Sequence, residues 1–533
     1  MKRYQKANEG IHAPEEVKEK AARPAGRPGH SRWMGAVAAV LVAAVIGGTA
    51  LWPRGAGEPD TLSNEDPGQP VPFSLDNPEQ GRSVSGNAGG GTHRTYALST
   101  AAGFELPPEP DPEDFQTEDG SFDYDAYWDA RDGWMNVVRA LQNQLDENTS
   151  IGDFVTKSTT QFLTGAGAEN RVYSPLNLYM ALAMLAETAG GESRQQILDA
   201  LGADSIETLR EDAAVVWQNY YQDDDMGTSV MANSLWLRDD MTYSQDTLDT
   251  LSASYYASSF AGEMGSAEYD QALQDWVNEQ TRGVLTEQAG GLSFDPETVL
   301  GLVSTLYFKS AWSAPFSPEL NTRDVFHSPS GDVEAEFLHT GDWHDGYYYW
   351  GEHFSAISLR FQSSYNHNMW LILPDEGYTV DDLIESGEAM EFLLADKYDH
   401  YDENGNVTTA GWANRAFRMI HLSLPKFDVS SELELAGGLK ALGITDVFDD
   451  SVSNFDPLGA GTTDPLYVSQ AQHAARVTID EEGCTAAAYV DLILVGNAAS
   501  PDEVVDFILD RPFLFAITGQ SDLPLFLGVV NQP

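Results

Sequence analysis

The long C-terminal region of the chain begins near residue 148. In its first part apolar residues recur at helical spacing. Further along they form short runs that either alternate with polar residues or are continuously apolar. The spacing predicts a helix over 154–165, and over 174–202 a helix, a glycine break and a second helix capped by Ser193. Further runs predict strands, and these lie at 230–239, 299–312, 368–377 and 419–429. Early helices followed by strands, without repeated strand–helix–strand units, indicate an α+β domain.

An uncharged apolar run, GAVAAVLVAAVIGGTAL, occupies 35–51 and is framed by Trp33 and Trp52. The run is about long enough to cross a bilayer, and tryptophan favours the membrane interfaces. Residues 1–32 are polar and basic, which favours a cytoplasmic N-terminus. We therefore expect 33–52 to be a single transmembrane anchor in the cell membrane, with the rest of the chain outside. A cleaved signal peptide and a secreted protein are the alternative, but a secretory n-region is short.

Two segments separate this run from the C-terminal region. Residues 53–120 are acidic and rich in Pro, Gly and Ser, a linker composition that cannot bury a core. Residues 121–147 place Trp128, Trp134 and Val137 at helical spacing. We expect a helical extension that packs on the following domain. An amphipathic stalk helix is the alternative.

The segment DEEGCTAAAYVDLILVGNAA, residues 480–499, has the alternation of a strand and the composition of a loop. One face would be entirely apolar and would begin with small side chains: Cys484, Ala486, Ala488, Val490, Leu492 and Leu494. The other face mixes polar, aromatic and apolar residues. Proline is absent from 481–500, so every backbone N–H could join a sheet. The pattern indicates a loop that can become a strand.

The run EEG, a small residue and then AAA resembles the hinge of the reactive-centre loop of serpins. The C-terminal runs DRPFLFAI and FLGVVNQP resemble the C-terminal signature of the same family. Further blocks follow in family order: SPLNLYMALAMLAETAGG (similar to the family's SPLSI-x-x-ALAM), STLYFKSAW, LILPDEG and LPKFDV. The resemblance covers roughly 148–533. It departs at Ser304, where the family usually has asparagine, and at 395–415, which is longer than typical.

The resemblance implies a serpin fold, with helices packed on three β-sheets and an exposed reactive-centre loop. It also implies an irreversible inhibitor of extracellular serine, or sometimes cysteine, proteases, here of a bacterial membrane-anchored type. The protease cuts the loop, and the N-terminal part of the loop then inserts into the central sheet. The hinge residues by this resemblance are Glu481, Glu482, Gly483, Cys484, Thr485, Ala486, Ala487 and Ala488. A non-inhibitory binding or carrier protein and a structural protein of the cell envelope are the alternatives.

The family register, counted from Gly483, places the cleaved bond between Asn497 and Ala498. Asn497 favours an asparagine-selective protease, whereas the flanking Val495, Ala498 and Ala499 favour an elastase-like one. A register error of one residue would exchange the two interpretations, so both stay open.

Cys484 is the only cysteine, which excludes an intrachain disulfide. We expect its thiol to be accessible before cleavage and buried on insertion, so that oxidation would convert the inhibitor into a substrate. The alternative is that Cys484 has no redox role and is simply a small residue in place of the family's Thr or Ser.

Composition excludes several functions. The chain carries 83 acidic and 29 basic residues, a net charge of −54, which would repel nucleic acids and heparin-like polyanions. It contains no GxSxG, HExxH or phosphate-loop motif. We therefore expect no enzymatic activity, no metal and no cofactor. We also expect the chain to be a monomer.

Overall fold

The computed structural model describes most of the chain after residue 148 and several shorter segments before it. The described residues are 38–46, 92–102, 110–116, 122–146, 149–223, 227–283, 285–341, 345–362, 367–401, 407–459, 466–484, 503–519 and 522–533.

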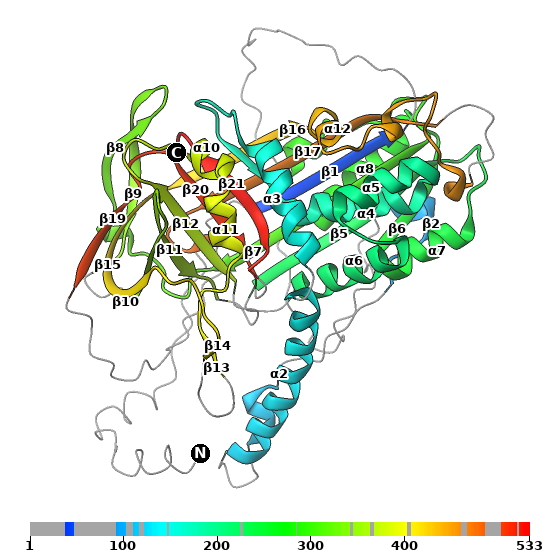
Figure 1. Ribbon diagram of the computed structural model, residues 1–533. Coiled ribbons are helices and arrows are strands. Elements are labelled where there is room, and N and C mark those ends of the chain that lie inside the picture. Colours follow the sequence, from blue (N-terminus) through cyan, green and yellow to red (C-terminus); the bar gives the residue numbers. More distant parts are fainter. Residues whose placement is uncertain are drawn as a thin grey trace, which may run out of the picture. The chain divides into compact units, whose positions relative to one another are not determined.

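The architecture is α+β, as the sequence predicts (Figure 1). A nine-stranded sheet has the strand order β16 (Phe427–Glu434), β17 (Val468–Ile479), β1 (Ala38–Ile46), β7 (Leu300–Ala311), β5 (Gly227–Arg238), β6 (Ala257–Gly262) and β2 (Ala97–Ser99). Two short strands pair with interior strands of this sheet: β18 (Gly483–Cys484) pairs with β7, and β4 (Gln222–Asp223) pairs with β5.

A second sheet has ten strands. Its order is β3 (Arg171–Tyr173), β21 (Pro524–Val530), β20 (Phe513–Thr518), β12 (Asn368–Pro374), β11 (Phe354–Arg360), β10 (Asp345–Trp350), β15 (Arg415–Pro425), β9 (Gly331–His339) and β8 (Thr322–Ser328), with β19 (Val504–Ile508) beside β15. A two-stranded hairpin, β13 (His400–Tyr401) and β14 (Val407–Thr409), forms a third sheet within the longer segment noted at 395–415.

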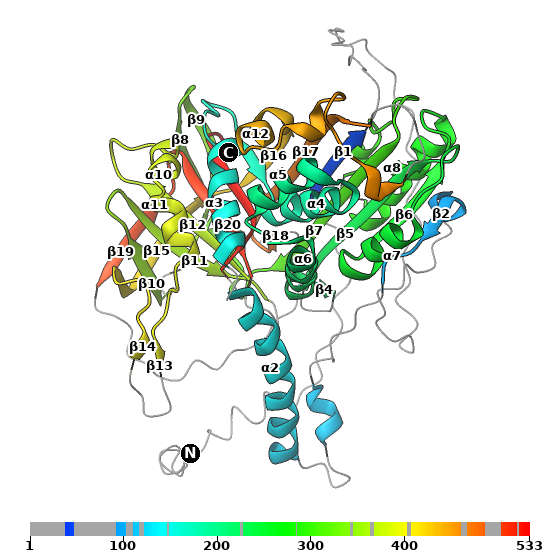
Figure 2. The ribbon, with the colours of Figure 1, turned by 45° about the vertical axis from the view of Figure 1, so that its right-hand side comes forward.

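Helices pack on both sheets (Figures 1 and 2). The α-helices are α2 (Tyr124–Asp146), α3 (Thr149–Leu163), α4 (Pro175–Thr188), α5 (Gly191–Leu201), α6 (Ile206–Tyr220), α7 (Gln245–Ser254), α8 (Ala267–Gln280), α9 (Thr286–Ala289), α10 (Val380–Glu385), α11 (Glu388–Leu394) and α12 (Ala436–Ala441). Short 3-10 helices are η1 (Thr92–Tyr96), η2 (Pro112–Phe115), η3 (Pro318–Leu320), η4 (Asp446–Phe448) and η5 (Asp456–Leu458).

Helix α4 is apolar on all sides, and every one of its residues is buried, which is typical of a core helix. Ser174 caps it and accepts a hydrogen bond from the N–H of Asn177. The expected cap of the next helix was wrong, because α5 begins at Gly191 and Ser193 lies inside it. The Ser193 hydroxyl instead accepts a hydrogen bond from the N–H of Asn454, 3.0 Å away.

The nine-stranded sheet is buried on both faces. Leu302, Leu306 and Phe308 of β7 belong to the main core, which includes α4 and α6. Val303 and Tyr307 of the same strand point the other way, into a second cluster with residues of α8. A strand placed beside β7 therefore meets apolar side chains on both of its faces.

Only Ala38–Ile46 of the apolar run 35–51 is described, as strand β1. β1 is antiparallel to β17 and to β7, with Val42 opposite both His473 and Ser304. Among the described residues, no helix is long and apolar enough to cross a bilayer. The membrane anchor stays a prediction.

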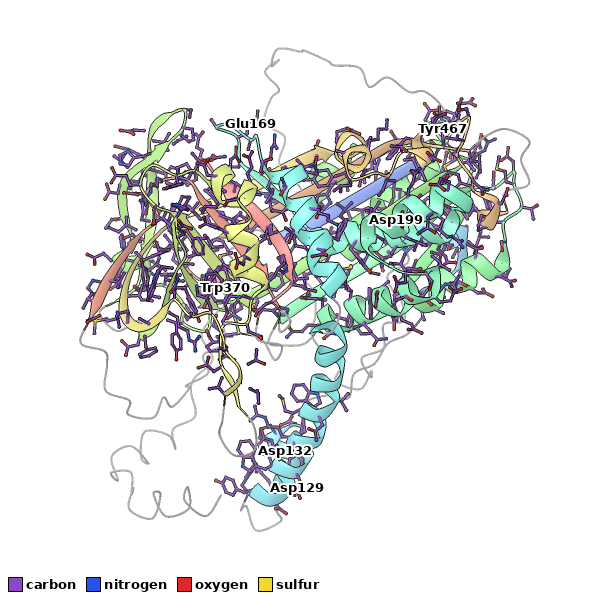
Figure 3. The ribbon with its side chains drawn as sticks, in the orientation of Figure 1. Asp129, Asp132, Glu169, Asp199, Trp370 and Tyr467 are labelled. Carbon is purple, nitrogen blue, oxygen red and sulfur yellow. The ribbon has the colours of Figure 1, made fainter. Side chains whose placement is uncertain are left out.

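Helix α2 forms within the expected extension and contacts α6. Trp134 is buried, whereas Trp128 and Val137 are exposed. The acidic Asp129 and Asp132 also lie on this helix (Figure 3). Only part of the apolar face of the helix is therefore covered.

Glu187 at the end of α4 is a buried carboxylate held by a bidentate pair with Arg210, at 2.7 and 2.8 Å. Arg210→Ala would leave the carboxylate with the Tyr255 hydroxyl alone, which is 3.1 Å away. We expect the free energy of unfolding to fall by about 3 kcal/mol, measured by denaturant unfolding. Arg238→Ala breaks the exposed pair with Asp240 and serves as the control, with a loss below about 1 kcal/mol. Equal losses would contradict the assignment.

Candidate functional site: the loop hinge

The hinge begins where β17 ends and the chain turns back to β7. The Asp480 carboxylate accepts hydrogen bonds from the N–H groups of Glu482, at 2.9 Å, and Gly483, at 3.1 Å. β18 then pairs antiparallel with the end of β7, with Gly483 opposite Ala311 and Cys484 opposite Ser310. The first two residues after this turn are therefore already part of the sheet.

Gly483 has a φ of +149°, a conformation that L side chains rarely adopt. A Cβ atom at this position would clash with the Ser310 carbonyl oxygen and would lie 2.7 Å from the Ala311 Cα. Both the turn and the close approach to β7 therefore require glycine.

Backbone hydrogen bonds fix the turn to the segment after β7. The N–H of Trp312 donates to the Glu482 carbonyl and the N–H of Phe316 donates to the Glu481 carbonyl, both at 2.9 Å. The Trp312 indole N–H donates to the Asp480 carbonyl at 3.0 Å. Three carbonyls in succession are therefore held, which leaves little freedom for the turn itself.

The Glu481 carboxylate is bound by two side chains. Lys426 Nζ lies 2.6 Å from it, and the Asn321 amide donates to it at 2.6 Å. Lys426 also pairs with Glu336 at 2.9 Å. Partial burial by itself raises the pKa of the Glu481 carboxyl, but hydrogen bonds from Lys426, its own backbone and Asn321 outweigh it and lower the pKa. The carboxylate is therefore ionised and fixes the start of the hinge.

Cys484 is fully buried, in the main core. The expectation that its thiol is accessible before cleavage was wrong. Its pairing with Ser310 of β7 carries the side chain into the sheet interior, and the sequence around Cys484 does not reveal a partner so distant in the chain. Oxidation of this thiol would require the hinge to leave the sheet first.

The rest of the expected site lies outside the described residues. This applies to the hinge residues Thr485, Ala486, Ala487 and Ala488 and to the expected cleavage site, Asn497 and Ala498. The description resumes at Glu503, whose carbonyl accepts a hydrogen bond from the N–H of Met419 at 3.1 Å. β19 then runs parallel to β15, with Val504 opposite Met419. Both ends of the segment 485–502 are therefore fixed to the fold.

β18 and β1 use the same edge of β7. Ser310 pairs with Gly227 of β5 on one side and with Cys484 on the other. Because a strand has two hydrogen-bonding edges, β18 lies on the edge opposite β5. β1 occupies that same edge, starting with Ala38 opposite Phe308. We call this place, between β7 and β17, the central position of the sheet.

Ser304, where the family usually has asparagine, lies at the middle of the central position. Its hydroxyl contacts the amide oxygen of Asn177 and lies 2.6 Å from that of Asn233. Asn177 in turn stands at the second serine of the family's SPLSI run. The serine and the asparagine are thus exchanged between α4 and β7, and in this chain their side chains are in contact.

His473 of β17 faces the start of α4. Its ring is buried, and its Nε2 accepts a hydrogen bond from the N–H of Ser174 at 3.0 Å. Burial lowers the pKa of His473 to about 3. The imidazole is therefore neutral at physiological pH.

This depressed pKa predicts loss of stability in acid. Between the ordinary pKa of 6.5 and about 3, the unfolded chain binds a proton at His473 that the folded chain does not. As the pH is lowered through this window, the free energy of unfolding should therefore decrease, and His473 should contribute about 1.4 kcal/mol of this decrease per pH unit. His473→Gln should remove that part of the slope. His327→Gln, at an exposed histidine whose pKa is raised by Asp332, should not. Equal slopes in both variants would contradict the assignment.

One group of described residues could hold a metal ion. Ligand atoms of Glu352, His353 and Glu388 lie within 4.8 Å of one another. Glu388 is already bound to His353 Nδ1 at 2.7 Å, a contact that raises the histidine pKa. An ion pair accounts for the cluster.

Trp312 and Lys426 lie within the family blocks STLYFKSAW and LPKFDV, but the sequence does not assign either residue to the hinge. Their neighbours in the sequence carry no signal for this role, because the contacts with 480–482 form only when separate strands meet. The fold alone identifies them.

Comparison with known proteins identifies the family of the chain. The family model "Serpin (serine protease inhibitor)" matches residues 149–533. Plasminogen activator inhibitor 1 of Neovison vison is 26% identical over 404 residues, 72% of this chain and 92% of the relative. Serpin-Z1C of Triticum aestivum is 28% identical over 378 residues, 69% of this chain and 91% of the relative. Alpha-1-antitrypsin 1-3 of Mus musculus is 27% identical over 401 residues, which cover 72% of this chain and 89% of the relative.

Solved structures show the same fold. The thermophilic serpin tengpin in the native state superposes with a TM-score of 0.60 at 24% identity, over 72% of this chain and 93% of that chain. The Arabidopsis serpin AtSerpin1, in its native stressed conformation, superposes with a TM-score of 0.57 at 22% identity, over 74% of this chain and 98% of that chain. The chain belongs to the serpin family. Its members are typically protease inhibitors and not enzymes.

Proposed function

We propose that this serpin irreversibly inhibits an extracellular serine or cysteine protease, which cuts the segment 485–502 and thereby allows the N-terminal part of that segment to insert into the sheet. The observation that carries the proposal is the burial of Cys484 beside Ser310, in register with the edge of β7. Insertion continues a pairing that has already begun.

The register of β18 predicts where the inserted residues would lie. Continued along β7, it places Ala486 opposite Phe308 and Leu494 opposite Leu300. Even-numbered loop residues would then share the face of Cys484, which belongs to the main core. These are the apolar residues of the alternating pattern, so the face that the sequence makes apolar is the face that needs to be buried.

The other face of the inserted strand would meet the second cluster. There Ala487 would lie opposite Tyr307, and Asp491 opposite Val303, which is buried. The small Ala487 fits beside a large side chain, whereas burial of a carboxylate at Asp491 would cost free energy. Insertion up to Val490 is therefore more favourable per residue than insertion beyond it.

The chemical step belongs to the protease. For a serine protease, the serine Oγ bonds to the Asn497 carbonyl carbon as the bond to Ala498 breaks, and the proton goes to the departing amine. The ester keeps the protease attached while the loop inserts. The Asn497 register and the elastase-like alternative both remain part of the proposal.

We also propose that residues 33–52 anchor the chain in the cell membrane with the serpin domain outside, as a bacterial membrane-anchored type. The same residues supply β1, and a segment cannot cross a bilayer and fill the central position at once. Loop residues from Ala486 onward need the positions that β1 takes opposite Phe308 to Leu300. Anchoring in the membrane would therefore free the central position for the loop.

The test is to mix the full chain, in lipid vesicles, with an elastase-like and an asparagine-selective protease. A covalent complex that survives denaturing gels, with a released C-terminal peptide that begins at Ala498, is the expected result. Complete cleavage without a complex would contradict inhibition and favour a non-inhibitory binding protein.

A further inference from the structure

An aromatic patch lies on the ten-stranded sheet beside the returning end of the loop. Phe417 of β15 is opposite Tyr347 of β10, with ring centroids 5.4 Å apart, and Tyr398 contacts Tyr347 at 5.9 Å. Along β15 the same face continues to Met419, which is opposite Val504 of β19. These five residues define the patch.

The patch is unusually exposed for apolar side chains. Tyr347, Phe417, Val504 and Tyr398 expose 39%, 43%, 50% and 57% of their surface. Contiguous exposed apolar residues of this kind mark interaction sites, and Tyr and Phe are enriched in the energetically important centres of interfaces. The patch therefore suits a protein partner.

The patch extends toward the start of the loop as well. A hollow of about 240 Å³ joins Tyr347 and Tyr398 to Trp312 and Phe316, which hold the hinge carbonyls. The loop leaves the fold at one end of this surface and returns at Val504, at the other. The surface thus lies between the two fixed ends of the segment 485–502.

Chain length determines what lies over this surface. From Ala498 to Glu503 the chain spans at most about 17 Å when fully extended. A protease of about 230 residues has a radius of gyration near 17 Å, so its body is wider than that span. A protease that holds the bond after Asn497 must therefore lie close to Val504.

Charge restricts the class of protease. Residues 480–511 carry eight acidic side chains and one basic residue, Arg511. Glu503 and Asp506, which flank the patch, each expose 71% of their side chains; Glu503 pairs with Arg418 at 2.7 Å, and Asp506 lies 3.1 Å from His421. With a net charge of −54 on the whole chain, this region attracts cationic proteins and repels acidic ones.

We propose that the aromatic patch is a second contact surface for the target protease, which is a basic enzyme with apolar side chains beside its cleft. This inference rests on the proposed inhibitory function, because the loop positions the partner. The patch contributes affinity and selection of the target, while the loop provides the cleaved bond.

The test measures reversible binding, separately from inhibition. The probes are a basic and an acidic elastase-like protease, each with the catalytic serine changed to alanine, and the binder is the full chain in vesicles. We expect the double variant Tyr347→Ser, Phe417→Ser to bind the basic enzyme about 30-fold more weakly. Leu98→Ser, at a residue 48% exposed on β2 at the far side of the molecule (Figures 1 and 2), should bind like the wild type. Association should slow at least tenfold between about 50 and 500 mM salt.

Several outcomes would overturn the inference. The double variant could bind like the wild type, or the acidic enzyme could bind as tightly as the basic one. A wild-type dimer that the double variant converts to a monomer would show that a second copy covers the patch. Tighter binding by the double variant would show that the loop itself covers it. Inhibition is tested separately, by mixing the wild-type chain with the active proteases and running denaturing gels. If the wild type binds the inactive basic enzyme as expected but forms no covalent complex with the active one, the proposed inhibition is refuted and the contact surface is not.

Discussion

Replacing Cys484 with arginine is expected to convert the protein from an inhibitor into a substrate of the same protease. Cys484 is fully buried opposite Ser310, and its side chain leads the face that must enter the main core. A guanidinium group there would be buried without a partner, which costs several kcal/mol. The hinge should leave the sheet and insertion should slow, so that hydrolysis of the acyl-enzyme is faster than insertion.

The measurement is the number of inhibitor molecules consumed for each protease molecule inhibited. We expect it to rise at least tenfold in Cys484→Arg, with cleaved chain in place of the covalent band. Cys484→Thr is the matched control, because a small side chain fits the same site, and it should inhibit like the wild type. Unchanged inhibition by Cys484→Arg would show that the hinge does not insert. Failure of Cys484→Thr would instead indicate a specific role for the thiol.

Val42→Pro is expected to open the central position of the sheet when lipid is absent. Val42 lies at the centre of β1, opposite Ser304 and His473. Proline supplies no N–H and is excluded from central strands, so β1 should leave the sheet. Membrane helices tolerate proline, so the variant should still enter a bilayer. The substitution thus separates the two roles that we propose for the same residues.

The measurement is uptake of a synthetic peptide of residues 485–495 by the full chain, followed by native gel electrophoresis. Without lipid, uptake should be at least tenfold faster in Val42→Pro than in the wild type. In vesicles both should take up the peptide at similar rates. Val42→Leu, which keeps the N–H and the apolar character, is the control. Rapid uptake by the wild type without lipid would refute competition between β1 and the loop.

The sequence predicts this fold well wherever local pattern and burial agree. The alternation at 419–429 is confirmed in β15, where Ile420, Leu422 and Leu424 are buried and His421 is exposed. Apolar runs likewise predicted β7 and β12 to within a few residues. In these strands the side-chain pattern reports directly on the two faces of a sheet.

Tertiary contacts decided the positions that sequence analysis misplaced. Ser193 has the residue type of a helix cap, but Asn454 uses its hydroxyl and the helix begins earlier. Cys484 belongs to a segment with loop composition, but β7 offers a free edge that pairs with it. The exchange of serine and asparagine between Asn177 and Ser304 is explained by the contact of α4 with β7, which the sequence alone does not reveal. Each case depends on a partner far away in the sequence.

The most direct test of the central claim is the stability of the full chain in lipid vesicles, where β1 leaves the central position free, after a single cut at the expected site between Asn497 and Ala498. If the loop inserts, burial of its apolar face in the main core should raise the melting temperature by roughly 10 °C or more. Backbone amides from Ala486 onward should become protected from hydrogen exchange as they join β7 and β17. An unchanged melting temperature with unprotected amides would show that the loop does not insert, and would contradict the proposed inhibitory mechanism.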